Sequence, residues 1–181
     1  GDIITLDRDS ISSYIDDGYI LDFTPNTQIL YKKIQTPSKG EPTESLWCYN
    51  IKSDEKKLLY TSTESIISAK FNPWNSEIAF LESNDKKNQL FIIYSSNKKP
   101  YKISFKNPID PEIIQWKSKD SLFIVDRVDN KSIIYDYDVT TNTEVNKISL
   151  KKRIMNIDIS LFTVRHPPFI FLLCYSMLLS E

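Results

Sequence analysis

Residues 66–81 decide the fold, and they read IISAKFNPWNSEIAFL. Two apolar segments, 66–71 and 76–82, flank the short polar turn Asn72–Asn75. Proline at position 73 has a fixed φ angle and no N–H to donate to a neighbouring strand, so it belongs in a turn. The stretch therefore predicts two antiparallel strands joined by a tight connection.

The same pattern occurs twice more, at residues 18–31 (GYILDFTPNTQILY) and 112–125 (EIIQWKSKDSLFIV). The anchoring aromatic residues Phe23, Phe71 and Trp116 are 48 and 45 residues apart. A period in the mid-forties with four short strands per repeat is typical of β-propeller blades. We therefore predict an all-β chain, a partial β-propeller of about three four-stranded blades with incomplete blades at both ends.

The predicted blades cover residues 18–63, 65–105 and 112–150. Within them, short apolar or alternating segments predict the strands, and little helix is expected. The first blade has a long insertion at 35–44 and later strands at 46–51 and 57–61. The predicted strands of the second blade are 66–71, 76–82, 89–94 and 101–105. Those of the third blade are 113–116, 122–125, 133–138 and 145–150. The aromatic residues expected in the core between blades are Phe71, Phe80, Phe91, Trp116 and Phe123.

The two ends of the chain lie outside the three predicted blades. Residues 1–160 form the propeller part, with 2–14 as closing strands of a preceding blade and 153–160 as the first strand of a fourth. Residues 161–181 form an apolar tail, whose stretch 169–179 is too short for a membrane helix, which needs about 20 residues. This tail is strand material of the last blade, a truncated or out-of-frame end, or the start of a membrane anchor. Ile154, Ile157 and the tail are expected on an open side that favours self-association.

The amino-acid composition of the chain disfavours or excludes several classes of function. The chain has 181 residues, 40% of them hydrophobic, and a mean hydropathy of -0.35, which is typical of a soluble globular protein. Lys plus Arg number 23 and Asp plus Glu 24, and this balance disfavours a nucleic-acid partner. The chain has only three glycines and none after Gly40, which excludes phosphate-binding loops and the nucleophile elbow of serine hydrolases.

Catalytic and metal-binding signatures are also missing from the sequence. His166 is the single histidine, and Cys48 and Cys174 form no Cys-x-x-Cys motif, so we expect free thiols and no metal site or cofactor. Asp136 and Asp138 are interpreted as the solvent-facing and turn-initiating residues of a strand, not as calcium ligands. No catalytic residue is predicted.

Trp74 is unusual because a large ring occupies the tip of a turn. One interpretation is that it caps a neighbouring blade. The other is that it contacts a partner, where such rings often dominate the binding energy.

A family resemblance rests on the repeated turns. The core of WD-like repeats of the TolB and prolyl oligopeptidase propeller type resembles two stretches of this chain: Phe71-Asn-Pro73 followed by Glu77-Ile-Ala-Phe80, and Phe23-Thr-Pro25. The third strand of those repeats resembles Leu46–Ile51 and Ile133–Asp138. Trp74 and Asn75 replace the usual Asp-Gly, and the Trp-Asp dipeptide is missing, so that family's hydrogen-bonded tetrad is not carried over.

The resemblance implies a non-catalytic scaffold that binds a protein or peptide, in the cell envelope, the periplasm or outside the cell. The partner and its binding residues are not predicted. One alternative is the propeller domain of a larger hydrolase, a prolyl oligopeptidase-like serine peptidase whose catalytic domain lies outside these residues. Another is a membrane-anchored surface domain, with the tail as the start of the anchor.

Overall fold

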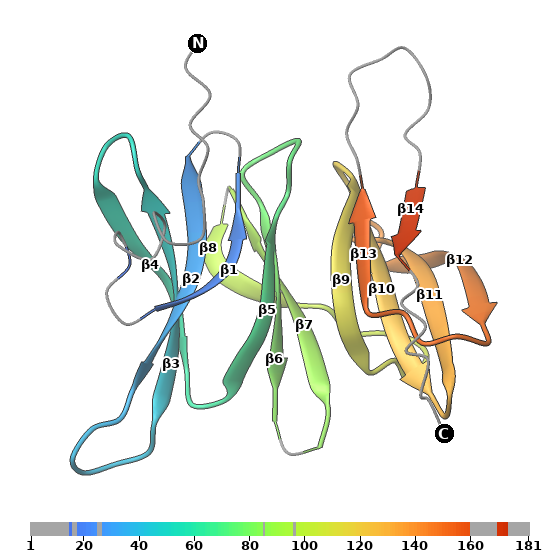
Figure 1. Ribbon diagram of the computed structural model, residues 1–181, viewed down its shortest axis with the longest axis horizontal. Coiled ribbons are helices and arrows are strands. Elements are labelled where there is room, and N and C mark those ends of the chain that lie inside the picture. The colour runs from blue at the N-terminus through green and yellow to red at the C-terminus, as the bar shows by residue number, and fades with distance from the viewer. Residues whose placement is uncertain are drawn as a thin grey trace, which may run out of the picture. The chain divides into compact units, whose positions relative to one another are not determined.

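The computed structural model describes residues 15, 18–24, 27–84, 86–95, 97–159 and 170–173. Every regular element in this part of the chain is a strand, and the strands form three four-stranded antiparallel sheets and one two-stranded sheet (Figure 1). The strands are β1 (Gly18–Phe23), β2 (Gln28–Gln35), β3 (Thr43–Asn50), β4 (Glu55–Ser62), β5 (Ser65–Phe71), β6 (Ile78–Ser83), β7 (Asn88–Tyr94), β8 (Asn97–Lys102), β9 (Pro111–Ser118), β10 (Ser121–Val128), β11 (Lys131–Asp138), β12 (Thr143–Leu150), β13 (Asn156–Ile159) and β14 (Ile170–Leu173). The all-β prediction with three four-stranded blades is confirmed.

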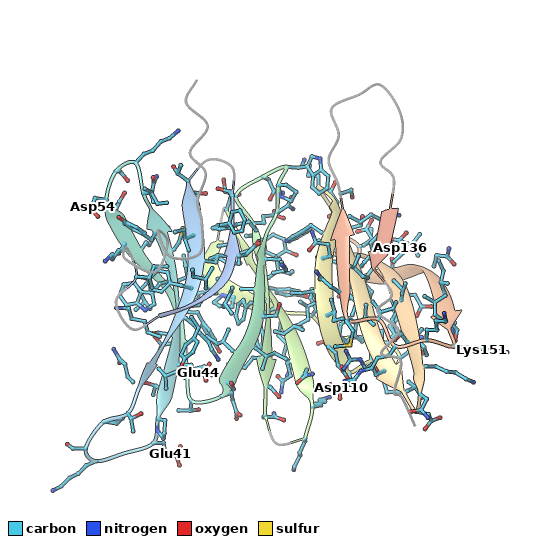
Figure 2. The ribbon with its side chains drawn as sticks, viewed as in Figure 1. Glu41, Glu44, Asp54, Asp110, Asp136 and Lys151 are labelled. Atoms are coloured by element: carbon cyan, nitrogen blue, oxygen red, sulfur yellow. The ribbon has the colours of Figure 1, made fainter. Side chains whose placement is uncertain are left out.

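The chain divides into two compact units, Gly1–Ser65 and Ile66–Glu181. In the first unit, strands β1 to β4 pair in sequence order. Its core contains Ile29, Tyr31 and Tyr49, and Trp47 packs beside them. The insertion predicted at 35–44 is the long β2–β3 hairpin, with Glu41 near its tip (Figure 2).

Phe23 lies in a different environment from Trp116, with which it aligns in the repeats. Its side chain is 57% exposed, whereas Trp116 of the third blade is completely buried. The pairing of β1 with β2 shifts between Ile20 and Asp22. A bulge of this kind interrupts the strict alternation of side chains between the two faces of a strand, which explains the different orientation.

The second unit contains two successive blades, β5–β8 and β9–β12, each paired in sequence order. Strand β9 lies against β6 and β7, and one core joins the two blades. That core includes Ala79, Leu81, Leu90 and Ile92 from the first of these blades and Ile114, Trp116, Leu122, Ile124, Tyr135 and Tyr137 from the second. The continuous apolar runs of β6 and β7 are therefore buried, as strands between stacked sheets require.

The last strand of the second blade was predicted at 101–105, but β8 spans Asn97–Lys102. Ile103 still donates its backbone N–H to the carbonyl of Leu90, after which the chain leaves the sheet. Phe105 then packs edge-on against Tyr137, with ring centroids 5.2 Å apart. The alternating residues 101, 103 and 105 look like a strand, but Phe105 is placed by packing on the next blade.

The expectation that Ile154 and Ile157 lie on an open side is wrong, because both are buried. They pack with Phe123, Val125 and Ile134, on the face of the third blade opposite the core shared with the second. Strand β13 lies beside β9 and pairs with β14. Ile154 and strand β13 therefore cover part of this face.

Part of the apolar tail is a strand, since β14 covers Ile170–Leu173. The predicted closing strands at 2–14 and the remainder of the tail lie outside the described residues. Among the residues that the structure describes, no helix has the length and apolar character needed to cross a membrane.

Candidate ligand-binding pocket

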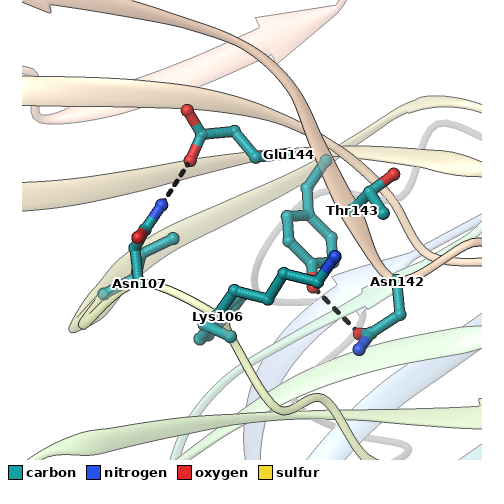
Figure 3. Close-up of a pocket in the computed structure, with 8 residues that line it drawn as sticks. Lys106, Asn107, Asn142, Thr143 and Glu144 are labelled. Atoms are coloured by element: carbon teal, nitrogen blue, oxygen red, sulfur yellow. Dashed lines mark hydrogen bonds between the residues drawn. The ribbon is translucent and has the colours of Figure 1, made fainter.

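A pocket of about 340 Å³ lies in the second unit, between the β8–β9 connection and the β11–β12 hairpin (Figure 3). It is lined by aromatic, aliphatic, charged, amide and hydroxyl side chains. These are Phe105, Lys106, Asn107, Ile109, Tyr137, Asn142, Thr143 and Glu144. The pocket therefore combines apolar wall with groups that can orient a ligand, as small-molecule and peptide sites commonly do.

Tyr137 provides a buried part of the lining. Its ring meets Phe105 nearly at right angles, at 81°, which is a favourable aromatic geometry. Burial raises the pKa of the Tyr137 hydroxyl above its ordinary value of 10.0. It donates a hydrogen bond to Oδ1 of Asn142 over 2.9 Å.

The hairpin residue Asn142 is held on both sides of its amide. It accepts from Tyr137, and its Nδ2 donates to the backbone carbonyl of Ser104 over 3.3 Å. Its φ of 55° lies in the left-handed region that asparagine tolerates well. Asn142 thus ties the β11–β12 turn to the β8–β9 connection and fixes the spacing of the pocket walls.

Two charged residues of opposite sign complete the lining. Asn107 donates from Nδ2 to Oε2 of Glu144 over 3.4 Å. Within the described part of the chain, the ammonium group of Lys106 makes no ion pair. Figure 3 draws Lys106 between the Asn107–Glu144 pair and Asn142. The pocket can therefore offer a cation, a carboxylate oxygen and an aromatic surface to one ligand.

The carboxylates considered in the sequence have structural roles. Asp138 accepts from the backbone N–H groups of Thr140 and Thr141, so it starts the turn as expected, and these bonds lower its pKa. Asp136 does not simply face solvent: it is largely buried and forms an ion pair with Lys117 across the sheet. Both are thus accounted for by the blade itself.

The structure describes only one of the three cysteine and histidine residues of the chain, Cys48. Cys48 is a free, half-buried thiol on β3, and burial raises its pKa. His166 and Cys174 lie outside the described residues. In the described ranges, no three His, Cys, Asp or Glu side chains gather closely enough to hold a metal ion.

Trp74 occupies the β5–β6 turn and is 41% exposed. The turn beneath it is well ordered, because Asn72 is buried and its Oδ1 accepts from the Trp74 backbone N–H over 3.0 Å. Its two interpretations, a cap on a blade and a partner contact, both stay predictions.

Sequence reasoning did not find the pocket, since it assigned Phe105 to a strand. The polar break Lys106-Asn107-Pro108 directly after that residue was the available signal. The opposite wall, residues 137–144, belongs to another blade, and its proximity is a tertiary property.

No protein-family model matches this sequence, and no curated protein matches it. Several solved structures do resemble the fold. The β-propeller domain of the Trilobed protease from Pyrococcus furiosus is 17% identical, with a TM-score of 0.56 over 75% of this chain and 43% of that chain. An oligogalacturonate lyase in complex with manganese is 14% identical, with a TM-score of 0.57 over 72% of this chain and 42% of its own.

An acylaminoacyl peptidase in complex with Z-Gly-Gly-Phe-chloromethyl ketone is 15% identical, with a TM-score of 0.57. The match covers 82% of this chain and 27% of the peptidase chain. The chain thus spans less than half the length of each of these three proteins. At such identities the likeness concerns the fold alone, and it shows that the four-stranded antiparallel sheets are blades of a partial β-propeller.

Proposed function

We propose that this chain is a non-catalytic β-propeller module that binds a protein or peptide partner, a scaffold of the TolB-like kind. The observation that carries the proposal is the pocket between the β8–β9 connection and the β11–β12 hairpin. Loops held by a rigid sheet scaffold are the usual place for binding residues. A resemblance of the repeats at residues 66–81 to TolB-type propellers supports the same function.

The chemistry of the lining favours holding a ligand. The Tyr137 hydroxyl and the Asn142 amide are engaged in a chain of hydrogen bonds that ends at the Ser104 carbonyl. Such a chain positions the walls before the ligand arrives, which reduces the entropy cost of binding.

Selection of phage-displayed peptides on the immobilised chain tests this proposal. We expect a recurring peptide sequence that, as a free peptide, binds one per chain in calorimetry. Thr143→Trp places a large ring in the pocket and should abolish this binding. Thr140→Trp is the matched control, because Thr140 is exposed on the same hairpin and does not line the pocket. No recurring peptide, or equal binding by both variants, contradicts the proposal.

A second candidate is the propeller domain of a larger hydrolase of the serine peptidase type. It is favoured by the propeller neighbours that are themselves parts of a protease and an acylaminoacyl peptidase. In this case the protein made from the complete natural gene cleaves blocked peptides and is labelled by a fluorophosphonate probe, whereas the 181-residue chain is not. Absence of labelling in the complete protein contradicts this candidate.

A further inference from the structure

We infer that the pocket binds a peptide carboxylate, with the ligand's carboxylate at Lys106 and one of its N–H groups at Glu144. This inference rests on the proposed peptide-binding function and names its ligand chemistry. Both a C-terminal carboxylate and an acidic side chain have this chemistry, because each lies close to a peptide N–H.

The two charges of the pocket are not equivalent. Glu144 is already engaged through Oε2 by the Asn107 amide, whereas Lys106 has no carboxylate partner among the described residues. Elsewhere in the described chain, Lys32 pairs with Glu44 and Lys117 with Asp136, whereas Lys106 is exposed beside the pocket. An incoming anion would therefore complete a charge-assisted hydrogen bond at Lys106.

Glu144 adds a second contact of the opposite kind. Its engagement by Asn107 leaves acceptor capacity on the carboxylate, which has about four lone-pair sites. A ligand that presents only a negative charge would be repelled by Glu144. A ligand that presents a carboxylate and an N–H together matches both groups, and this selects a peptide over a simple anion.

The size and wall of the pocket agree with a short peptide segment. A volume of about 340 Å³ is at the low end of ligand pockets, which suits one or two residues and not a folded domain. The edge of the Phe105–Tyr137 pair provides an apolar surface for the methylene groups of the ligand.

Nuclear magnetic resonance titration of the ¹⁵N-labelled chain tests the inference with three peptides. These are acetyl-Ala-Glu-Ala-amide, its Gln counterpart, and acetyl-Ala-Ala-Ala with a free C-terminal carboxylate. We expect at least one acidic peptide to shift the amide signals of Lys106, Asn107, Asn142 and Glu144. Its affinity should exceed that of the Gln peptide by about fivefold, the range of an exposed ion pair. The acidic peptide that binds identifies the source of the carboxylate.

Lys106→Gln should remove the preference for the acidic peptide and leave the weak binding of the Gln peptide unchanged. Lys102→Gln is the matched control, because Lys102 is exposed on β8 and does not line the pocket. Equal affinities for acidic and neutral peptides, a preference that survives Lys106→Gln, or no shift with any peptide overturns the inference. If phage-selected neutral peptides still bind in the pocket, the proposed function stands and only the carboxylate inference fails.

Discussion

The indole Nε1 of Trp116 donates a hydrogen bond to the backbone carbonyl of Lys70 over 3.1 Å. Trp116 lies on β9 and Lys70 on β5, the first strands of two successive blades. The two residues are 46 positions apart in the chain, which corresponds to one repeat of the sequence. This bond therefore joins equivalent strands of neighbouring blades, and it does so from a completely buried ring.

Replacing Trp116 with Phe should destabilise the second unit. The change removes the hydrogen bond to Lys70 and leaves part of the ring volume empty, at a cost of about 1–3 kcal/mol. Urea unfolding followed by circular dichroism gives the difference in the free energy of unfolding. Trp74→Phe is the control, since the exposed turn residue should change stability by less than about 0.5 kcal/mol. Equal effects of the two substitutions would contradict the assigned role of Trp116.

Asn72→Ala should weaken the junction between the same two blades. Asn72 is buried, accepts from the backbone of Trp74, and donates from Nδ2 to the carbonyl of Lys119 over 2.9 Å. Loss of both bonds should cost about 1–3 kcal/mol in urea unfolding. Asn84→Ala, which removes bonds within its own exposed turn, should cost less. A larger effect at Asn84 would show that the bond between blades adds nothing.

Ile154→Ala tests the finding that β13 covers the third blade. The side chain is completely buried among Phe123, Val125 and Ile134, so its truncation should cost about 2–4 kcal/mol. The adjacent Met155 is 55% exposed, and Met155→Ala should have little effect. Thermal and urea unfolding of the two variants side by side measure the difference. If both are neutral, Ile154 does not pack on this blade.

Asp126 should make the chain less stable as the pH rises. Burial raises its pKa above the ordinary 3.8, and the nearby charges of Asp110 and Glu112 add to this effect. The folded state thus holds the Asp126 proton more tightly than the unfolded state, and the associated stability is lost as the pH rises from 3.8 through the folded pKa. Asp126→Asn should therefore gain stability relative to the original chain over this range. Unfolding free energies measured from well below pH 3.8 up to neutral pH show the trend.

Asp138 should behave in the opposite direction. The backbone N–H groups of Thr141 and Thr140 lower its pKa, so its contribution is present above the ordinary value of 3.8 and is lost as the pH falls through the folded pKa. In the same titration, Asp138→Asn should lose stability relative to the original chain above pH 3.8 and match it at lower pH. If both substitutions change the free energy of unfolding in the same direction, the raised pKa of Asp126 and the lowered pKa of Asp138 are not both correct.

Local sequence was sufficient to predict most of the strands and turns. The Asn72-Pro73 turn, the buried runs of β6 and β7 and the turn started by Asp138 all follow from residues that lie next to one another in the chain. Proline geometry, alternation and Asx turns act over a few residues, so a single sequence carries them.

The tertiary structure decided which surfaces those strands cover. Whether Ile154 is open or buried depends on its segment folding back onto Phe123 and Val125, and the position of Phe105 depends on Tyr137 of the next blade. The pocket arises in the same way, because residues 105–109 and 137–144 come from different blades. Apolar patterning shows that a side chain needs a partner but not which one, since burial energy is roughly proportional to area and has no direction.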